Sequence, residues 1–138
     1  MIERLVDLHC KPGSPFDGDD RALAHALIAQ HEATGTLAVE RDATGGISGF
    51  MAWIRTDRHG ADCVRWLGLS NLIFLAVPIA FCGPFVVITF DAIAPGADSL
   101  TIARLYAQVK AASPDGKRLA THLVTRRGAK WVERRLHS

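Results

Sequence analysis

Residues 85–112 read FVVITFDAIAPGADSLTIARLYAQVKAA, and they combine the sequence signals of a strand and of a helix. Its opening run of β-branched and aromatic residues predicts a buried strand over 85–94. Pro95-Gly96 ends the strand, and Asp98 or Ser99 is a suitable N-cap for the next helix. Apolar residues then recur at helical spacing to about residue 112. The stretch therefore predicts a strand followed by a helix.

Helices and strands also alternate on either side of this stretch. The expected elements are a helix over 20–33 capped by Asp19 or Asp20, a hairpin of strands over 36–40 and 47–55, a polar loop over 56–62, a short helix within 64–77 and a strand over 118–127. The pattern of the final WVERRLHS fits a strand and a short helix equally well. We therefore expect one α+β domain over 1–138, with a mixed, mainly antiparallel central sheet flanked by helices and a crossover helix between two late strands.

Between Arg65 and Asp91 lie 25 residues without a charge. The run is long enough to cross a bilayer. However, Pro78 and Gly83-Pro84 divide it into pieces that are too short to do so. A buried helix followed by a buried strand is the preferred interpretation, and membrane association through residues 66–90 is the alternative.

The composition indicates a globular protein. The chain has 138 residues, of which 49% are hydrophobic and 22% charged, so collagen-like, disordered and disulfide-scaffold classes do not fit. Three cysteines without CxxC spacing, and acidic residues where an export signal has bases, predict a cytoplasmic location. Cys82 and the tryptophans are expected in the core or in pocket walls. No histidine has metal-ligand spacing, so no metal is expected.

The charges are unevenly distributed along the chain. Residues 1–103 have seven Lys and Arg against twelve Asp and Glu, whereas residues 104–138 have nine against two. The basic third would suit an acidic carrier protein, cofactor phosphates or nucleic acid, or it is simply a solvated face. Nucleic acid is not favoured, because the sequence contains no recognition helix, zinc finger or aromatic RNA-binding motif.

Four segments resemble a known family. They are GFMAW (49–53), FVVITFDAIAPGAD (85–98), LTIARLYAQVKA (100–111) and RLATHLVTRRGAKW (118–131). Together they resemble the GNAT-type acyltransferase plan, and most of all the toxin-activating lysine acyltransferases of RTX toxins. That family moves a fatty acyl group from acyl-carrier protein to a protein lysine. The resemblance implies a GNAT-like domain, and it places the motif aspartate at Asp91.

The chain departs from that family at two motifs. The family's catalytic histidine belongs to a Ser-Pro-Leu-His segment, whereas here Ser14-Pro15-Phe16 is followed by Asp17. The histidine therefore does not transfer to this chain. The usual GNAT phosphate-loop pattern is also absent from the helix start.

Acyl transfer to an amine needs a base, donors for the oxyanion and a slot for the thioester arm. Asp91 ends the uncharged run, where burial would raise its pKa and suit a base or a group that orients a histidine. An ordinary strand-end aspartate is the alternative. His9 and His25 are the candidates to replace the motif histidine, whereas His31 lies on the apolar stripe of its helix and is expected to pack.

The donor is expected where the helix begins. Free backbone N–H groups there would hold a phosphate or a pantetheine arm. The candidate donor-binding residues are Ile93, Gly96, Ser99 and Arg104. Asp98 would repel a phosphate, and an N-cap role is sufficient to explain it.

The sequence thus predicts an N-acyltransferase that uses acyl-CoA or acyl-carrier protein and modifies a protein lysine. Two alternatives remain. One is a non-catalytic module on the same fold that binds an acidic protein or nucleic acid, and the other is a membrane-associated protein. Acyl length, acceptor and oligomeric state stay open.

Overall fold

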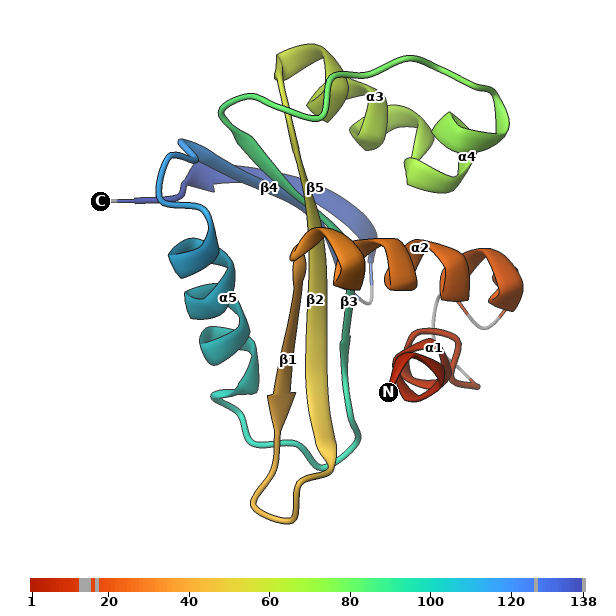
Figure 1. Cartoon of the computed structure of the whole chain (residues 1–138), viewed down its shortest axis with the longest axis vertical. Coiled ribbons are helices and arrows are strands. Elements are labelled where there is room, and N and C mark those ends of the chain that lie inside the picture. Colours follow the sequence, from red (N-terminus) through yellow and green to blue (C-terminus); the bar gives the residue numbers. More distant parts are fainter. Residues whose placement is uncertain (13–15, 17, 126, 138) are drawn as a thin grey trace. The chain divides into compact units, whose positions relative to one another are not determined.

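The computed structural model describes residues 1–12, 16, 18–125 and 127–137 (Figure 1). In chain order the elements in this part of the chain are α1 (Ile2–His9), α2 (Arg21–Thr34), β1 (Leu37–Arg41), β2 (Ile47–Thr56), α3 (Arg58–Leu67), α4 (Leu69–Phe74), β3 (Phe85–Ile93), α5 (Thr101–Ala112), β4 (Arg118–Thr125) and β5 (Gly128–Arg135). The strands form one mixed sheet in the order β1-β2-β3-β4-β5, with helices flanking it. The fold is α+β, as predicted.

The chain forms two compact units. The first comprises Met1–Trp53 and Phe90–Ala112, and the second comprises Ile54–Thr89 and Ser113–Ser138. Strands β2 and β3 supply residues to both.

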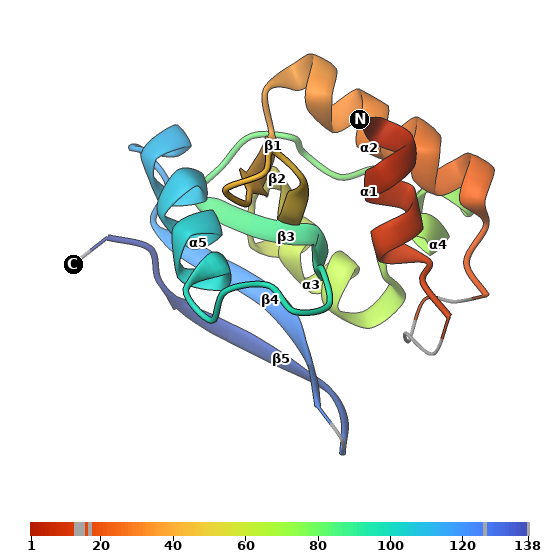
Figure 2. The same ribbon diagram turned by 90° about the horizontal axis from the view of Figure 1, so that it is seen from below.

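Helices α1, α2 and α5 surround the strands of the first unit. The carboxylate of Asp20 caps α2 by accepting a hydrogen bond from the Leu23 N–H at 3.1 Å, and Gly35 ends the helix at a φ of 74°. Figure 2 shows α1 and α2 on one face of these strands and α5 on the other. The fully buried side chains of this unit include Leu5, Ile28, Phe50 and Leu105.

In the second unit, α3 begins earlier than predicted. The Asp57 carboxylate accepts a hydrogen bond from the Gly60 N–H at 2.8 Å, so the helix starts at Arg58 and the loop expected over 56–62 is wrong. The helix expected within 64–77 is divided at Gly68, whose φ is 77°.

An ion pair ties α3 to β5. Arg58 donates hydrogen bonds to both carboxylate oxygens of Glu133, at 2.6 and 2.9 Å. These bonds lower the pKa of Glu133 to about 2.

The crossover predicted around α5 is present. Strands β3 and β4 are parallel, with Phe85 opposite Arg118, and α5 connects them in the chain. The ambiguous C-terminal segment continues the antiparallel strand β5, in which Trp131 lies opposite His122.

The uncharged run is buried only in part. Residues 85–88 of β3 are buried, whereas Trp66 is 73% exposed and Cys82 is exposed as well. The prediction of a buried helix here is therefore wrong. Helix α4 has six residues, of which only Leu72 is buried. None of the helices in the described residues is both long and apolar enough to cross a bilayer.

Candidate functional site

Asp91 lies near the end of β3, in the first unit. Its side chain keeps an exposed surface, yet the surrounding protein raises its pKa by burial. The nearby charge of His9 opposes this rise and is the smaller effect. The result is a carboxylate that solvent reaches and that holds a proton more readily than an ordinary aspartate.

His9 is the histidine that the fold brings near Asp91. Its side chain is only 4% exposed, and its Nε2 lies 2.9 Å from Oδ2 of Asp19. The ring stacks on Phe16, with centroids 4.6 Å apart, and meets the edge of Phe90 at 4.9 Å. Asp19, Phe16 and Phe90 therefore fix the position of the His9 ring, and the charge of His9 lowers the pKa of Asp91.

His25 occupies a different place. It is exposed on α2, and it lines a cavity of about 400 Å³ together with Glu3 and Asp7 of α1. The hydrogen bonds described for the first unit do not join it to Asp91. The Ser14-Pro15 and Asp17 positions of the motif comparison lie outside the described residues.

His31 packs in the interior, as its place on the apolar stripe predicts. The side chain is 6% exposed, its Nδ1 lies 2.8 Å from the Thr36 hydroxyl, and its ring meets Phe90 edge-on. Burial lowers the pKa of His31 to about 4, and a hydrogen bond with the Trp53 backbone raises it by less.

This burial predicts a loss of stability in acid. His31 takes up a proton near pH 6.5 when unfolded and near pH 4 when folded, so its contribution is complete above about pH 6.5 and is lost as the pH falls toward 4. The loss is at most about 3 kcal/mol. Urea unfolding of His31→Gln should therefore depend less on pH across this window than unfolding of the unchanged protein.

Asp91 has the opposite effect on the pH dependence of stability. Its pKa is raised in the folded state, so its ionisation destabilises the folded protein as the pH rises. Its contribution is present in both proteins and cancels in the comparison. An identical pH dependence for the two proteins would contradict the assignment to His31.

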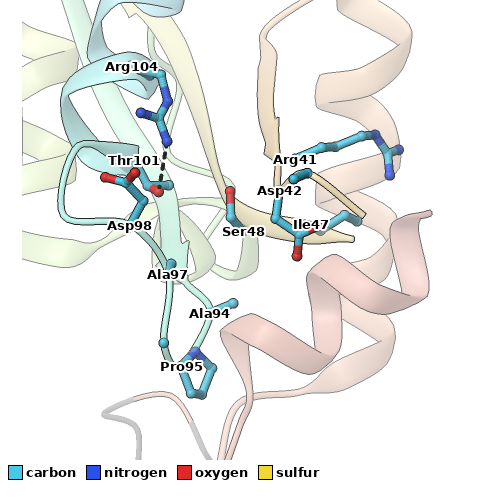
Figure 3. Close-up of a pocket in the computed structure, with 12 residues that line it drawn as sticks. Arg41, Asp42, Ile47, Ser48, Ala94, Pro95, Ala97, Asp98, Thr101 and Arg104 are labelled. Carbon is cyan, nitrogen blue, oxygen red and sulfur yellow. Dashed lines mark hydrogen bonds between the residues drawn. The ribbon is translucent and has the colours of Figure 1, made fainter. Parts of the chain in front are cut away.

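A cavity of about 280 Å³ lies beyond the end of β3 (Figure 3). It is lined by Arg41, Asp42, Ala43, Ile47, Ser48, Ala94, Pro95, Gly96, Ala97, Asp98, Thr101 and Arg104. Of the predicted donor-binding residues, Gly96 and Arg104 belong to this lining. Ile93 and Ser99 do not: the Ile93 carbonyl accepts a hydrogen bond from Lys11 at 3.4 Å, and Ser99 is exposed.

The charges of the lining are balanced. Arg104 donates to a Glu40 oxygen and to the Thr101 hydroxyl, each at 3.4 Å. The Asp98 carboxylate accepts from the Leu100 N–H at 2.7 Å, in the turn just before α5, rather than from an N–H inside the helix as an N-cap would. Two arginines and two aspartates in the lining suit a ligand of low net charge better than a polyanion.

Ser48 is the polar group that the sequence did not reveal. It is 6% exposed, and its hydroxyl oxygen has no hydrogen-bond partner among the described residues. Such a group costs about 1–3 kcal/mol when it is buried without a partner, and Ser48 belongs to the lining of the cavity. In the sequence, the indication of this position is a serine within a strand that is otherwise expected to be apolar.

Asp91 lines neither of the two cavities described above. The cavity lining nearest to it in the chain begins at Ala94, three residues further on.

The sequence was compared with models of known protein families and with curated proteins. No family model matches it, and no curated protein matches it.

Proposed function

We propose that the protein is an N-acyltransferase that moves an acyl group from a thioester donor to an amine, most simply a protein lysine. The observation that supports this best is the exposed Asp91 carboxylate with its raised pKa, on the strand that leads into the cavity. The resemblance to RTX toxin-activating lysine acyltransferases places the motif aspartate at this position. GNAT-like chemistry and a cytoplasmic location belong to the same proposal.

In the proposed reaction Asp91 is the base. Its carboxylate takes a proton from the amine as the nitrogen lone pair attacks the thioester carbonyl carbon. The C–N bond forms, the C–S bond breaks, and the sulfur leaves as a thiolate that takes up a proton. His9, held by Asp19, is a positioning residue whose charge limits the rise in the pKa of Asp91.

The cavity is the proposed site for the donor arm. Ser48 would donate a hydrogen bond to a phosphate or amide oxygen of the phosphopantetheine arm, with Arg104 in the same lining. The volume of about 280 Å³ and the balanced charge fit this arm better than a whole nucleotide. Acyl-carrier protein and acyl-CoA both present the arm, so both remain candidate donors.

A non-catalytic binding module is the second candidate function. The specific observation in its favour is that Asp91 lines neither described cavity. In that case the cavity would bind the pantetheine arm, or a similar ligand, without chemistry at Asp91.

The two functions are separated by incubation with donors of different acyl length. Acetyl and palmitoyl thioesters of coenzyme A and of acyl-carrier protein are each mixed with the protein and a lysine-containing peptide. Thermal unfolding reports binding, and mass spectrometry reports transfer of the acyl mass to the peptide. Transfer supports the enzyme, a thermal shift without transfer supports the binding module, and neither result with any donor contradicts both.

Ser48→Ala should separate binding from stability. Removing an unsatisfied buried hydroxyl should leave the free energy of unfolding unchanged or slightly raised. Donor affinity should nevertheless fall by roughly 3- to 10-fold, since one hydrogen bond of about 1 kcal/mol is lost. Calorimetric titration with the donor measures this change. Equal affinity for the donor in the variant and the unchanged protein would show that Ser48 does not bind the donor.

A further inference from the structure

The second unit exposes a group of large apolar side chains along residues 66–81, which we call the 66–81 patch. It consists of Trp66, Leu67, Ile73, Phe74, Leu75 and Phe81. Phe74 is 86% exposed, Trp66 73% and Phe81 69%. Isolated exposed apolar residues are normal, but so many within one short segment mark an interaction surface.

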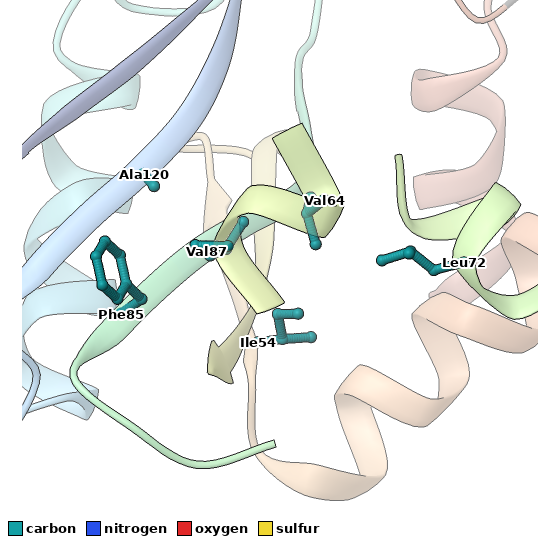
Figure 4. Packing of buried hydrophobic residues seen from close by; sticks show 7 residues of the cluster. Ile54, Val64, Leu72, Phe85, Val87 and Ala120 are labelled. Atoms are coloured by element: carbon teal, nitrogen blue, oxygen red, sulfur yellow. The ribbon is translucent and has the colours of Figure 1, made fainter. Parts of the chain in front are cut away.

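Buried side chains attach helices α3 and α4 to the core of the second unit. Val64 and Leu72 are 4% and 3% exposed, and they pack in the core of this unit with Ile54 and Val87 (Figure 4). The end of α3 and helix α4 thus expose apolar side chains although Val64 and Leu72 already anchor these helices in the core. The outer face is not needed to hold the helices in place, so its apolar character needs another explanation.

A cation lies directly beside the patch. The Arg65 guanidinium is 4.5 Å from the centre of the Trp66 ring, and no aspartate or glutamate occurs between Asp62 and Asp91. The residues of the second unit include ten Lys and Arg against four Asp and Glu, whereas those of the first unit include six against ten. An approaching partner would therefore meet apolar rings beside cations, which favours an anionic surface.

We propose that the 66–81 patch binds the surface of an anionic phospholipid bilayer. The aromatic rings would insert at the level of the headgroups, and Arg65 beside Trp66 would contact a lipid phosphate. This is surface association, and it does not depend on acyl transfer.

A bilayer fits the patch better than a partner protein does. Protein interfaces contain about one hydrogen bond per 100–200 Å². The polar side chains within 66–81 are those of Ser70 and Asn71, and the Asn71 amide already donates to the Leu67 carbonyl at 2.6 Å. A lipid surface needs no hydrogen bonds from these side chains.

Vesicle flotation tests the proposal with the full chain. We expect binding to vesicles of phosphatidylcholine and phosphatidylglycerol (3:1), weak binding to phosphatidylcholine alone, and a several-fold loss in 0.5 M NaCl. Phe74→Ala/Phe81→Ala should bind at least about tenfold more weakly. Leu100→Ala/Ile102→Ala is the matched control, because it removes exposed apolar side chains from the first unit, and it should bind normally.

A second measurement does not depend on the folding of the double variant. Vesicles that contain brominated lipid should quench tryptophan emission in the unchanged protein, and Trp66→Phe should remove most of the quenching while keeping the binding. Equal binding to both lipid compositions, undiminished binding by the Phe74/Phe81 variant, or quenching that persists in Trp66→Phe would overturn the proposal. So would binding of an acidic protein, such as acyl-carrier protein, through the patch with no binding to either vesicle.

Discussion

Asp91→Asn should lower the rate of acyl transfer by about 10²- to 10⁴-fold, the usual contribution of a general base. Asparagine has nearly the same shape as aspartate but cannot accept the proton from the amine. Asp91→Glu keeps the carboxylate at a shifted position and should retain part of the activity. Transfer is measured by mass spectrometry of the acylated peptide at saturating donor.

The same substitution should not harm the fold. Burial disfavours the ionised form of Asp91, so a neutral amide should leave the free energy of unfolding at pH 7 unchanged or slightly higher. Donor affinity should also be preserved, because Asp91 does not line the cavity. A large loss of stability or of donor binding would mean that Asp91 is structural, and the proposed role as base would be wrong.

Gly60→Ala should produce the largest loss of stability among the single substitutions considered. A Cβ at Gly60 would lie 1.7 Å from the Thr56 hydroxyl oxygen and 2.9 Å from the Thr56 Cβ. Thr56 is fully buried, and its hydroxyl donates to the Ala80 carbonyl at 2.7 Å, so it cannot turn away without breaking that bond. Overpacking and the lost hydrogen bond should outweigh the better helix propensity of alanine by about 2–4 kcal/mol.

Thermal unfolding measures this effect, with an expected fall in Tm of roughly 5–15 °C. Gly18→Ala is the control, since no atom lies within 4 Å of its added Cβ, and it should leave the Tm unchanged. Thr56→Ala removes the clashing oxygen, so the double variant Gly60→Ala/Thr56→Ala should be more stable than the sum of the two single losses implies. Strict additivity would show that the clash is not the cause.

The strand–helix–strand succession was predictable because its signals are local. A β-branched run, the Pro95-Gly96 break and the turn at Asp98 each act on neighbouring backbone, and the structure places β3 and α5 within one or two residues of the expected bounds. Helix α1 was not predicted. Its eight residues are too few to establish a period.

Burial in the uncharged run was harder to predict. A segment that is apolar on every side gives no indication of which face turns inward, so the core position Leu72 could not be distinguished from the exposed Trp66 and Phe74. Hydrophobicity alone therefore predicted a core in a segment where Trp66, Phe74 and Phe81 are exposed.

The candidate site was predicted in outline only. Asp91 and His9 were identified, and the fold brings them close enough for their charges to interact. The pairing of His9 with Asp19 was not foreseen: both Asp19 and Asp20 suited the helix cap, and the structure uses Asp20. The unsatisfied hydroxyl of Ser48 depends on residues distant in sequence, which no local pattern reveals.

The proposed role of the Asp91 carboxylate as the base in acyl transfer can be tested by the pH dependence of the transfer rate in the unchanged protein and in Asp91→Asn. At saturating donor, the rate of the unchanged protein should rise through an ionisation above the ordinary aspartate pKa of 3.8, because burial raises the pKa of Asp91. The residual rate of the variant should lack this step. The same acidic step in both proteins, or no transfer by the unchanged protein at any pH, would contradict the account.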